Sequence, residues 1–127
     1  MSRHSNHFGA FEIDSLPGQS QVAVCHAFVV PEDRRGQGHG HRLKHLQEIE
    51  LDLQHYDLAI CTVAATNVRQ KSILEKAGWK RIAAFRNRRS CEITEMWQRG
   101  GLPDEELDIA HLPVIPQPTP ERRSRPD

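Results

Sequence analysis

The sequence lacks the features that mark several classes of protein. No apolar run reaches the roughly 18 residues that a membrane-spanning helix needs, and no signal-peptide core follows the N-terminus. Neither sign of charge predominates, because 17 basic residues balance 17 acidic ones, which argues against nucleic acid or a membrane surface as a partner. We therefore expect a cytoplasmic protein, and its 127 residues suit a single domain.

Cysteine is also scarce, and its three residues are odd in number and far apart: Cys25, Cys61 and Cys91. This pattern argues against a disulfide framework or a zinc site and predicts buried, reduced thiols. His41 and His45 are one helical turn apart, but no carboxylate or cysteine completes a plausible set of ligands. We therefore expect no metal.

What the sequence does contain is a strand, a glycine-rich basic loop and a helix in direct succession. Residues 22–30 are apolar or β-branched for the most part, and helical periodicity begins near residue 39. The loop between them reads Arg34-Arg35-Gly36-Gln37-Gly38-His39-Gly40-His41. Glycines allow the backbone to approach a ligand, and the N–H groups and dipole of a helix N-terminus attract anions. The pattern predicts a site for a phosphorylated cofactor.

Two common phosphate-binding motifs do not fit this loop. The dinucleotide motif needs a glycine three residues after Gly38, and the P-loop needs a following Gly-Lys-Ser/Thr. The spacing Arg35-x-x-Gly38-x-Gly40, placed after a Val-Val-Pro-Glu strand end, resembles instead the acetyl-CoA signature of the GNAT superfamily of N-acetyltransferases. The resemblance implies that loop amides and the helix N-terminus hold the CoA pyrophosphate. The alternative is a glycine-rich turn that only joins strand to helix.

A second segment, residues 67–79, resembles another GNAT signature. Asn67 follows an apolar strand and precedes a short helix that ends in Glu-Lys-Ala-Gly-Trp. The resemblance implies that Asn67 binds the pantetheine arm of CoA where two parallel strands splay apart and expose backbone groups. Asn67 is also a good helix N-cap, and the two roles are compatible. Together the two signatures cover roughly residues 8–98.

The expected fold is an α/β domain of GNAT type with a mixed sheet, over residues 1–100. It comprises an N-terminal β-hairpin, a β-α-β-α core with splayed parallel strands, and a C-terminal β-hairpin. The predicted strands are 8–13, 21–30, 57–65, 79–85 and 91–97, and the predicted helices are 39–54 and 68–77. Residues 1–7 are expected to be loose, and residues 101–127 to form a proline-rich, partly disordered tail. In the first helix, apolar spacing places Leu43, Leu46, Ile49 and Leu53 on the buried face, with Lys44 and Gln47 largely outside.

The sequence departs from the GNAT pattern in two places. Many members carry a tyrosine seven residues after the asparagine as proton donor to the leaving thiolate, and this chain has Leu74 there. The family also normally places a strand, two helices and another strand before the hairpin, whereas few residues precede it here. The chain therefore looks N-terminally shortened, with an incomplete acceptor pocket, and we expect a homodimer that covers exposed sheet edges.

The resemblance implies direct acetyl transfer from acetyl-CoA to an amine of unknown identity, either a small molecule or a protein. A non-catalytic GNAT-derived binding module is the alternative, favoured by the same two departures. His26 is the candidate general base, on one face with Phe28 and Val30 if the strand alternates, and a core histidine is the alternative. The expected cofactor contacts are Phe28, Val29, Val30, Arg34, Arg35, Gly36, Gln37, Gly38, His39, Gly40, His41 and Asn67.

Overall fold

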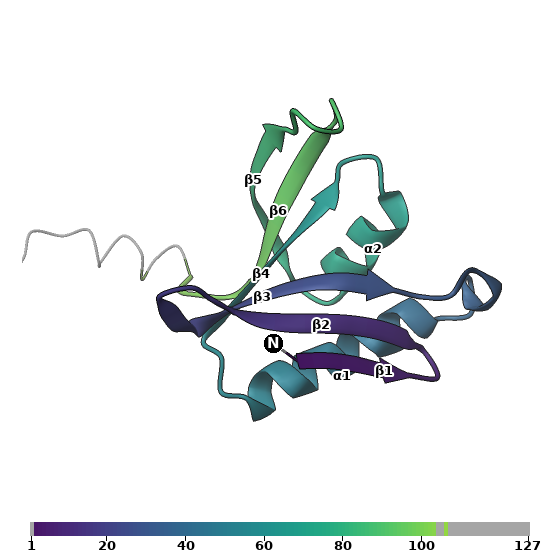
Figure 1. Ribbon diagram of the computed structural model, residues 1–127, viewed down its shortest axis with the longest axis horizontal. Coiled ribbons are helices and arrows are strands. Elements are labelled where there is room, and N and C mark those ends of the chain that lie inside the picture. The colour runs from purple at the N-terminus through teal and green to yellow at the C-terminus, as the bar shows by residue number, and fades with distance from the viewer. Residues whose placement is uncertain (1, 104–105, 107–127) are drawn as a thin grey trace, which may run out of the picture.

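Six strands form one mixed sheet in the order β1-β2-β3-β4-β6-β5 (Figure 1). The computed structural model describes residues 2–103 and residue 106. The strands are β1 (Ser2–Asn6), β2 (Gly9–Leu16), β3 (Gln19–Val29), β4 (Leu58–Ala64), β5 (Lys80–Arg86) and β6 (Ile93–Gly100). The helices are α1 (His39–Leu53), α2 (Val68–Lys76) and the short 3-10 helix η1 (Glu32–Arg34).

The arrangement confirms the predicted α/β class and the order of its elements. β2 and β3 form an antiparallel hairpin, β3 and β4 are parallel, and β5 and β6 form the second hairpin. The parallel ladder is short: Val22–Val24 pair with Leu58–Ile60, although β3 continues to residue 29 and β4 to residue 64. Beyond these three pairs the two strands diverge, which is the predicted splay.

The prediction that residues 1–7 are loose was wrong, because Ser2–Asn6 form the edge strand β1. This segment has no apolar alternation, so its own sequence carries no strand signal. It is held by the antiparallel ladder to β2, by an ion pair of 2.6 Å between Arg3 and Glu12, and by the His4 ring stacked on Phe11. The N-terminal hairpin is thus part of a three-stranded meander.

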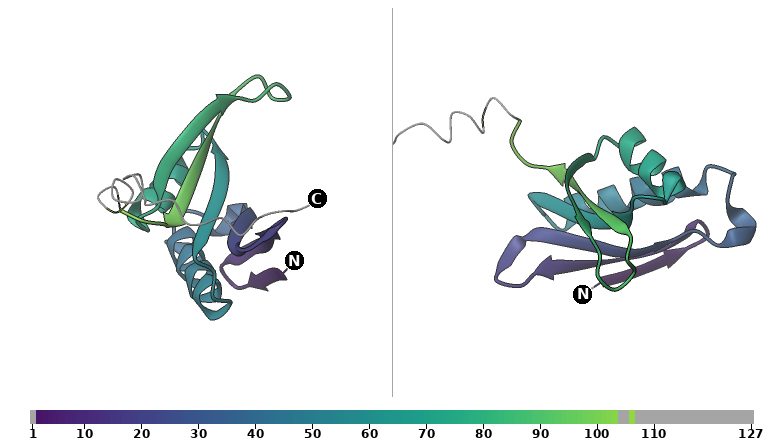
Figure 2. Two further views of the ribbon diagram at one scale, coloured as in Figure 1. Left: turned by 90° about the vertical axis from the view of Figure 1, so that its left-hand side faces the viewer. Right: turned by 90° about the horizontal axis from the view of Figure 1, so that it is seen from above.

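Both helices lie on the same side of strands β1–β3 (Figure 2). The core between them and the sheet contains Phe11 and Ile13 from β2, Leu43 and Leu51 from α1, and Leu74 from α2, all nearly inaccessible to solvent. The described part of the chain contains no helix long and apolar enough to span a membrane.

The buried face of α1 differs from the predicted one. Leu43, Lys44, Gln47 and Leu51 are buried, whereas Ile49 is 42% and Leu53 is 67% exposed. The apolar periodicity was misleading because two long polar side chains occupy core positions. The buried face of α1 is therefore rotated by part of a turn from the face that the spacing of apolar residues predicts.

This assignment of the helix face predicts opposite sensitivities for two leucines of α1. Leu51→Ala should lower the free energy of unfolding by about 2–5 kcal/mol, because it opens a cavity at a fully buried site. Leu53→Ala should change it by less than about 0.5 kcal/mol, since that side chain is mostly solvated. Urea denaturation of the two variants measures both values, and equal effects would contradict the assigned face.

The predicted tail, residues 101–127, falls almost entirely outside the described residues.

The three cysteines were predicted to be buried thiols. Cys25 is buried and Cys61 is half-buried, but Cys91 is exposed. Cys91 lies in the loop between β5 and β6 rather than in a strand, which is why the prediction for it was wrong.

Candidate functional site

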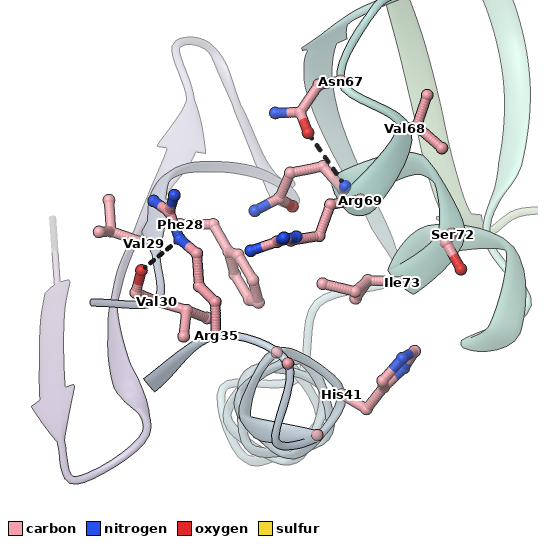
Figure 3. Close-up of a pocket in the computed structure, with 14 residues that line it drawn as sticks. Phe28, Val29, Val30, Arg35, His41, Asn67, Val68, Arg69, Ser72 and Ile73 are labelled. Atoms are coloured by element: carbon pink, nitrogen blue, oxygen red, sulfur yellow. Dashed lines mark hydrogen bonds between the residues drawn. The ribbon is translucent and has the colours of Figure 1, made fainter. Parts of the chain in front are cut away.

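A cleft opens where β3 and β4 diverge and the N-termini of α1 and α2 come together (Figure 3). Its volume is about 790 Å³. One wall is the end of β3, the floor is the glycine loop and the first turn of α1, and the other wall is the first half of α2. Two helix N-termini thus border the same space, a geometry that favours a negatively charged ligand.

The glycine loop gives the cleft its close backbone approach. Gly38 is the N-cap of α1 with a left-handed φ of 77°, and Gly36 has a φ of 82°. Gly40 lies against α2, because a Cβ there would come within 2.5 Å of the Ile73 Cδ1 atom. Backbone rather than side chains therefore lines the cleft at Gly36, Gly38 and Gly40, and the two helices pack closely together.

The structure brings nine of the twelve predicted cofactor residues to the cleft and leaves three outside its walls. The nine are Phe28, Val29, Val30, Arg35, Gly36, Gly38, Gly40, His41 and Asn67. Of the other three, Gln37 is exposed, and Arg34 donates a hydrogen bond to the His7 carbonyl. His39 packs its ring against His7 and Phe8 of the β1–β2 turn.

Three charged or amide side chains border the cleft, those of Arg35, Asn67 and Arg69. Arg35 Nε donates to the Val30 carbonyl at 3.1 Å, and Asn67 Oδ1 accepts the Gln70 amide at 3.1 Å as the N-cap of α2 (Figure 3). Sequence reasoning missed Arg69, whose guanidinium extends from α2 toward Phe28 across the cleft (Figure 3). Its position in the first turn of the helix, two residues after the predicted cap Asn67, is the signal that could have found it.

His26 does not share a face with Phe28 and Val30, so that expectation was wrong. A β-bulge at Ala27, with a φ of 54°, interrupts the alternation of β3. The imidazole therefore lies on the face of the sheet opposite the helices, where Nε2 is 2.6 Å from Asp14 and Nδ1 is 3.6 Å from Glu12. Sequence reasoning missed both carboxylates.

A second, smaller cleft of about 370 Å³, the inner cleft, adjoins the first, the outer cleft, and shares Phe28, Asn67 and Gln70 with it. It lies between the diverging strands, with Cys25 on one side and Cys61 on the other. Backbone groups of both strands lose their ladder partners here, so an extended ligand rich in amides would satisfy them.

Glu95 on β6 ties α2 to the second hairpin beside this cleft. Glu95 is 4% exposed, and its carboxylate accepts hydrogen bonds from Lys71 at 3.2 Å, Arg81 at 3.3 Å and Trp97 at 3.0 Å. Burial raises the pKa of Glu95, but the Lys71, Trp97 and Arg81 contacts outweigh burial and leave the pKa below its ordinary value. The ionised cluster therefore anchors α2.

The described residues contain no group of three His, Cys, Asp or Glu side chains that could hold a metal ion.

Neither the family models nor the curated proteins include a match to this sequence. Solved structures do match. Ard1 from Thermoplasma volcanium aligns over 74% of this chain and 63% of its own, with a TM-score of 0.65 and 19% identity. The chain has the GNAT fold.

Two other GNAT-fold structures are similar to the same extent. Ribosomal-protein-alanine N-acetyltransferase from Brucella melitensis aligns over 71% of this chain and 59% of its own (TM-score 0.62, 13% identity). A Bacillus subtilis acetyltransferase in complex with CoA aligns over 73% and 68% (TM-score 0.62, 15% identity). The chain covers less than two thirds of several such neighbours, 58% in one case. The likeness shows the GNAT fold and not the activity of these enzymes.

Proposed function

We propose that this protein is an acetyl-CoA-dependent N-acetyltransferase that transfers an acetyl group directly to an amine. The observation that carries the proposal is the pair of adjoining clefts. The outer one offers the anion-binding features that a pyrophosphate needs, and the inner one offers the unpaired strand edges that pantetheine amides need. A neighbour of the same fold was solved with CoA, which supports this assignment.

The first experiment is isothermal titration of the purified chain with acetyl-CoA and with CoA. Micromolar binding of both would support the cofactor assignment and justify a screen of small amines and peptide N-termini with free thiol as readout. Absence of binding in a folded sample would refute the cofactor. Binding without turnover on any amine would favour a non-catalytic module.

Within this proposal His26 acts as the general base. Asp14 and Glu12 flank its imidazole and would stabilise the protonated ring that forms when the amine loses its proton. The ring is 41% exposed on the face opposite α1 and α2, where an acceptor amine could approach while CoA occupies the clefts. The GNAT signatures themselves do not supply this residue.

His26→Ala should lower kcat about 100-fold or more, the usual contribution of a general base, and leave the Kd for acetyl-CoA unchanged. His45→Ala is the matched control, since His45 is an exposed histidine on α1 outside both clefts. Steady-state kinetics and titration of the two variants provide the measurement. A normal kcat in His26→Ala would remove His26 from the mechanism.

We also propose that the protein is a cytoplasmic homodimer. β5 is an edge strand whose residues are all exposed, and it presents Ile82 and Phe85, each 46% exposed, near the exposed Ile93 of β6. An edge with apolar side chains is a surface that natural proteins usually cover. Light scattering with size-exclusion chromatography tests this point, and a monomer at micromolar concentration would refute it.

A further inference from the structure

The inner cleft contains a buried primary amine. Lys44 comes from the second turn of α1, is 3% exposed, and lines the cleft together with Cys25, Cys61 and Leu74. Its Nζ donates a 2.7 Å hydrogen bond to Gln47 Oε1 and lies 4.6 Å from the centroid of the Phe28 ring. Within the described part of the chain it makes no ion pair.

Burial lowers the pKa of the Lys44 amine below its ordinary value of 10.5. The Cys61, Cys25 and Glu48 side chains oppose this effect only in part. The rings of Phe28 and Trp79 lie against the same amine. His41, His45 and Lys76 face it from a small neighbouring cavity, and the positive charge of Lys76 acts in the same direction as burial. A larger share of Lys44 is therefore neutral at physiological pH than of an exposed lysine, and a neutral amine is a nucleophile.

Gln47 supplies a second, independent sign of a ligand. It is fully buried, lines the same cleft, and its Nε2 atom has no hydrogen-bond partner among the described residues. Because Lys44 Nζ donates to Oε1, the side-chain NH₂ group cannot be relieved by flipping the amide. A buried, unpaired N–H donor is costly, and an acceptor oxygen from a ligand would satisfy it.

We propose that Lys44 is a site of self-acylation by a thioester bound in the inner cleft. The amine nitrogen attacks the thioester carbonyl carbon, the N–C bond forms and the C–S bond breaks. The thiol leaves with the proton that the amine loses, and Gln47 Nε2 donates to the carbonyl oxygen during attack. The inference rests on the proposed thioester cofactor, and its product is a stable amide, so each chain accepts one acyl group.

The two thiols of the cleft do not compete for the acyl group. Burial raises the pKa of Cys25 to about 12 and raises that of Cys61, because no compensating positive charge outweighs the loss of solvent. Both sulfurs remain protonated at neutral pH, and the thiolate is the nucleophilic form. The acyl group therefore goes to nitrogen.

The test incubates the full-length chain with acetyl-CoA and, separately, with S-acetyl-N-acetylcysteamine, a small thioester without a nucleotide. Peptide mass spectrometry then follows each lysine. We expect one acetyl group per chain at Lys44, formed at pH 8 at least about tenfold faster than at exposed Lys76 and Lys80, since the bound thioester is held beside Lys44 and burial leaves more of its amine neutral. Gln47→Leu should slow the labelling of Lys44 about tenfold or more.

Lys44→Met should abolish the fast label, and the matched variant Lys80→Arg should leave it unchanged. If titration shows that acetyl-CoA binds while Lys44 reacts no faster than Lys76 and Lys80, the self-acylation site is refuted and the cofactor assignment stands. If acetyl-CoA does not bind but the small thioester labels Lys44 rapidly, the amine site stands and the cofactor is wrong. Failure with the small thioester as well would overturn both.

Discussion

A glutamate at position 38 should abolish binding of acetyl-CoA while leaving the protein folded. Gly38 is the N-cap of α1 at the floor of the outer cleft, and its left-handed φ of 77° is a backbone conformation that favours glycine. Gly38→Glu places bulk and a negative charge where the pyrophosphate is proposed to lie. We expect at least about 100-fold weaker binding by isothermal titration, which corresponds to about 2.8 kcal/mol.

Gly18 provides a close control for this variant. It lies in the β2–β3 turn, outside both clefts, with the same φ of 77° and the same open space where a Cβ atom would lie. Gly18→Glu therefore introduces the same charge and a similar backbone strain of about 1–3 kcal/mol. Both variants should lose similar stability, and only Gly38→Glu should lose the ligand. Equal affinity in the two variants would refute the role of the loop.

The second large effect concerns Lys44 and Gln47, the buried polar pair of α1. Replacing both with apolar residues of similar size, Lys44→Met with Gln47→Leu, should raise the free energy of unfolding by about 1–3 kcal/mol at pH 7. The reason is that a poorly solvated amine and an unpaired amide N–H are both removed from the core. Urea denaturation of the wild type and the double variant measures the difference.

The pH dependence of this gain has a defined sign. Burial lowers the pKa of Lys44 in the folded state, so above that value the unfolded chain binds more protons than the folded one. Wild-type stability then rises with pH until the pH reaches the unfolded value of 10.5, and the advantage of the double variant should shrink over the same interval.

Lys71 offers a variant for comparison with Lys44, because its ammonium group forms an ion pair with Glu95. Lys71→Met removes one of the ion pairs of buried Glu95 and should lower the free energy of unfolding by about 1–2 kcal/mol, a figure reduced for the partial exposure of Lys71. If the double variant at positions 44 and 47 is destabilised as well, the buried pair is a structural element rather than one held for function at a cost in stability.

Much of this fold was predictable from local signals. The glycine spacing after residue 34, the cap at Asn67 and the apolar runs fix the elements and their order, because turn chemistry and helix capping act over a few residues. The parallel pairing follows from the helix between the two strands. The glycine loop and Asn67 accordingly line one cleft, and their contacts with CoA stay a prediction.

The remainder depends on contacts between distant residues. β1 is a polar strand that forms because β2 offers it a free edge, and the buried face of α1 contains Lys44 and Gln47, which periodicity assigns to solvent. The bulge at Ala27 has neither glycine nor proline to mark it, so the orientation of His26 could not be read from alternation. Site residues that break a local pattern are the hardest to predict.

The short ladder between β3 and β4 also has a mechanical consequence. Three residue pairs of the sheet, the contact between α1 and α2, and the hydrogen bonds from Arg99 and Trp79 to α1 join one half of the molecule (β1–β3 with α1) to the other (β4–β6 with α2). The β3–β4 ladder has fewer residue pairs than any other ladder of the sheet, so amide hydrogens at its ends should exchange with solvent sooner than those within either half. A ligand that lies between β3 and β4 and forms hydrogen bonds to both strands would extend the link between the two halves. Its binding would appear as slower exchange along β3 and β4, far beyond the atoms that it touches.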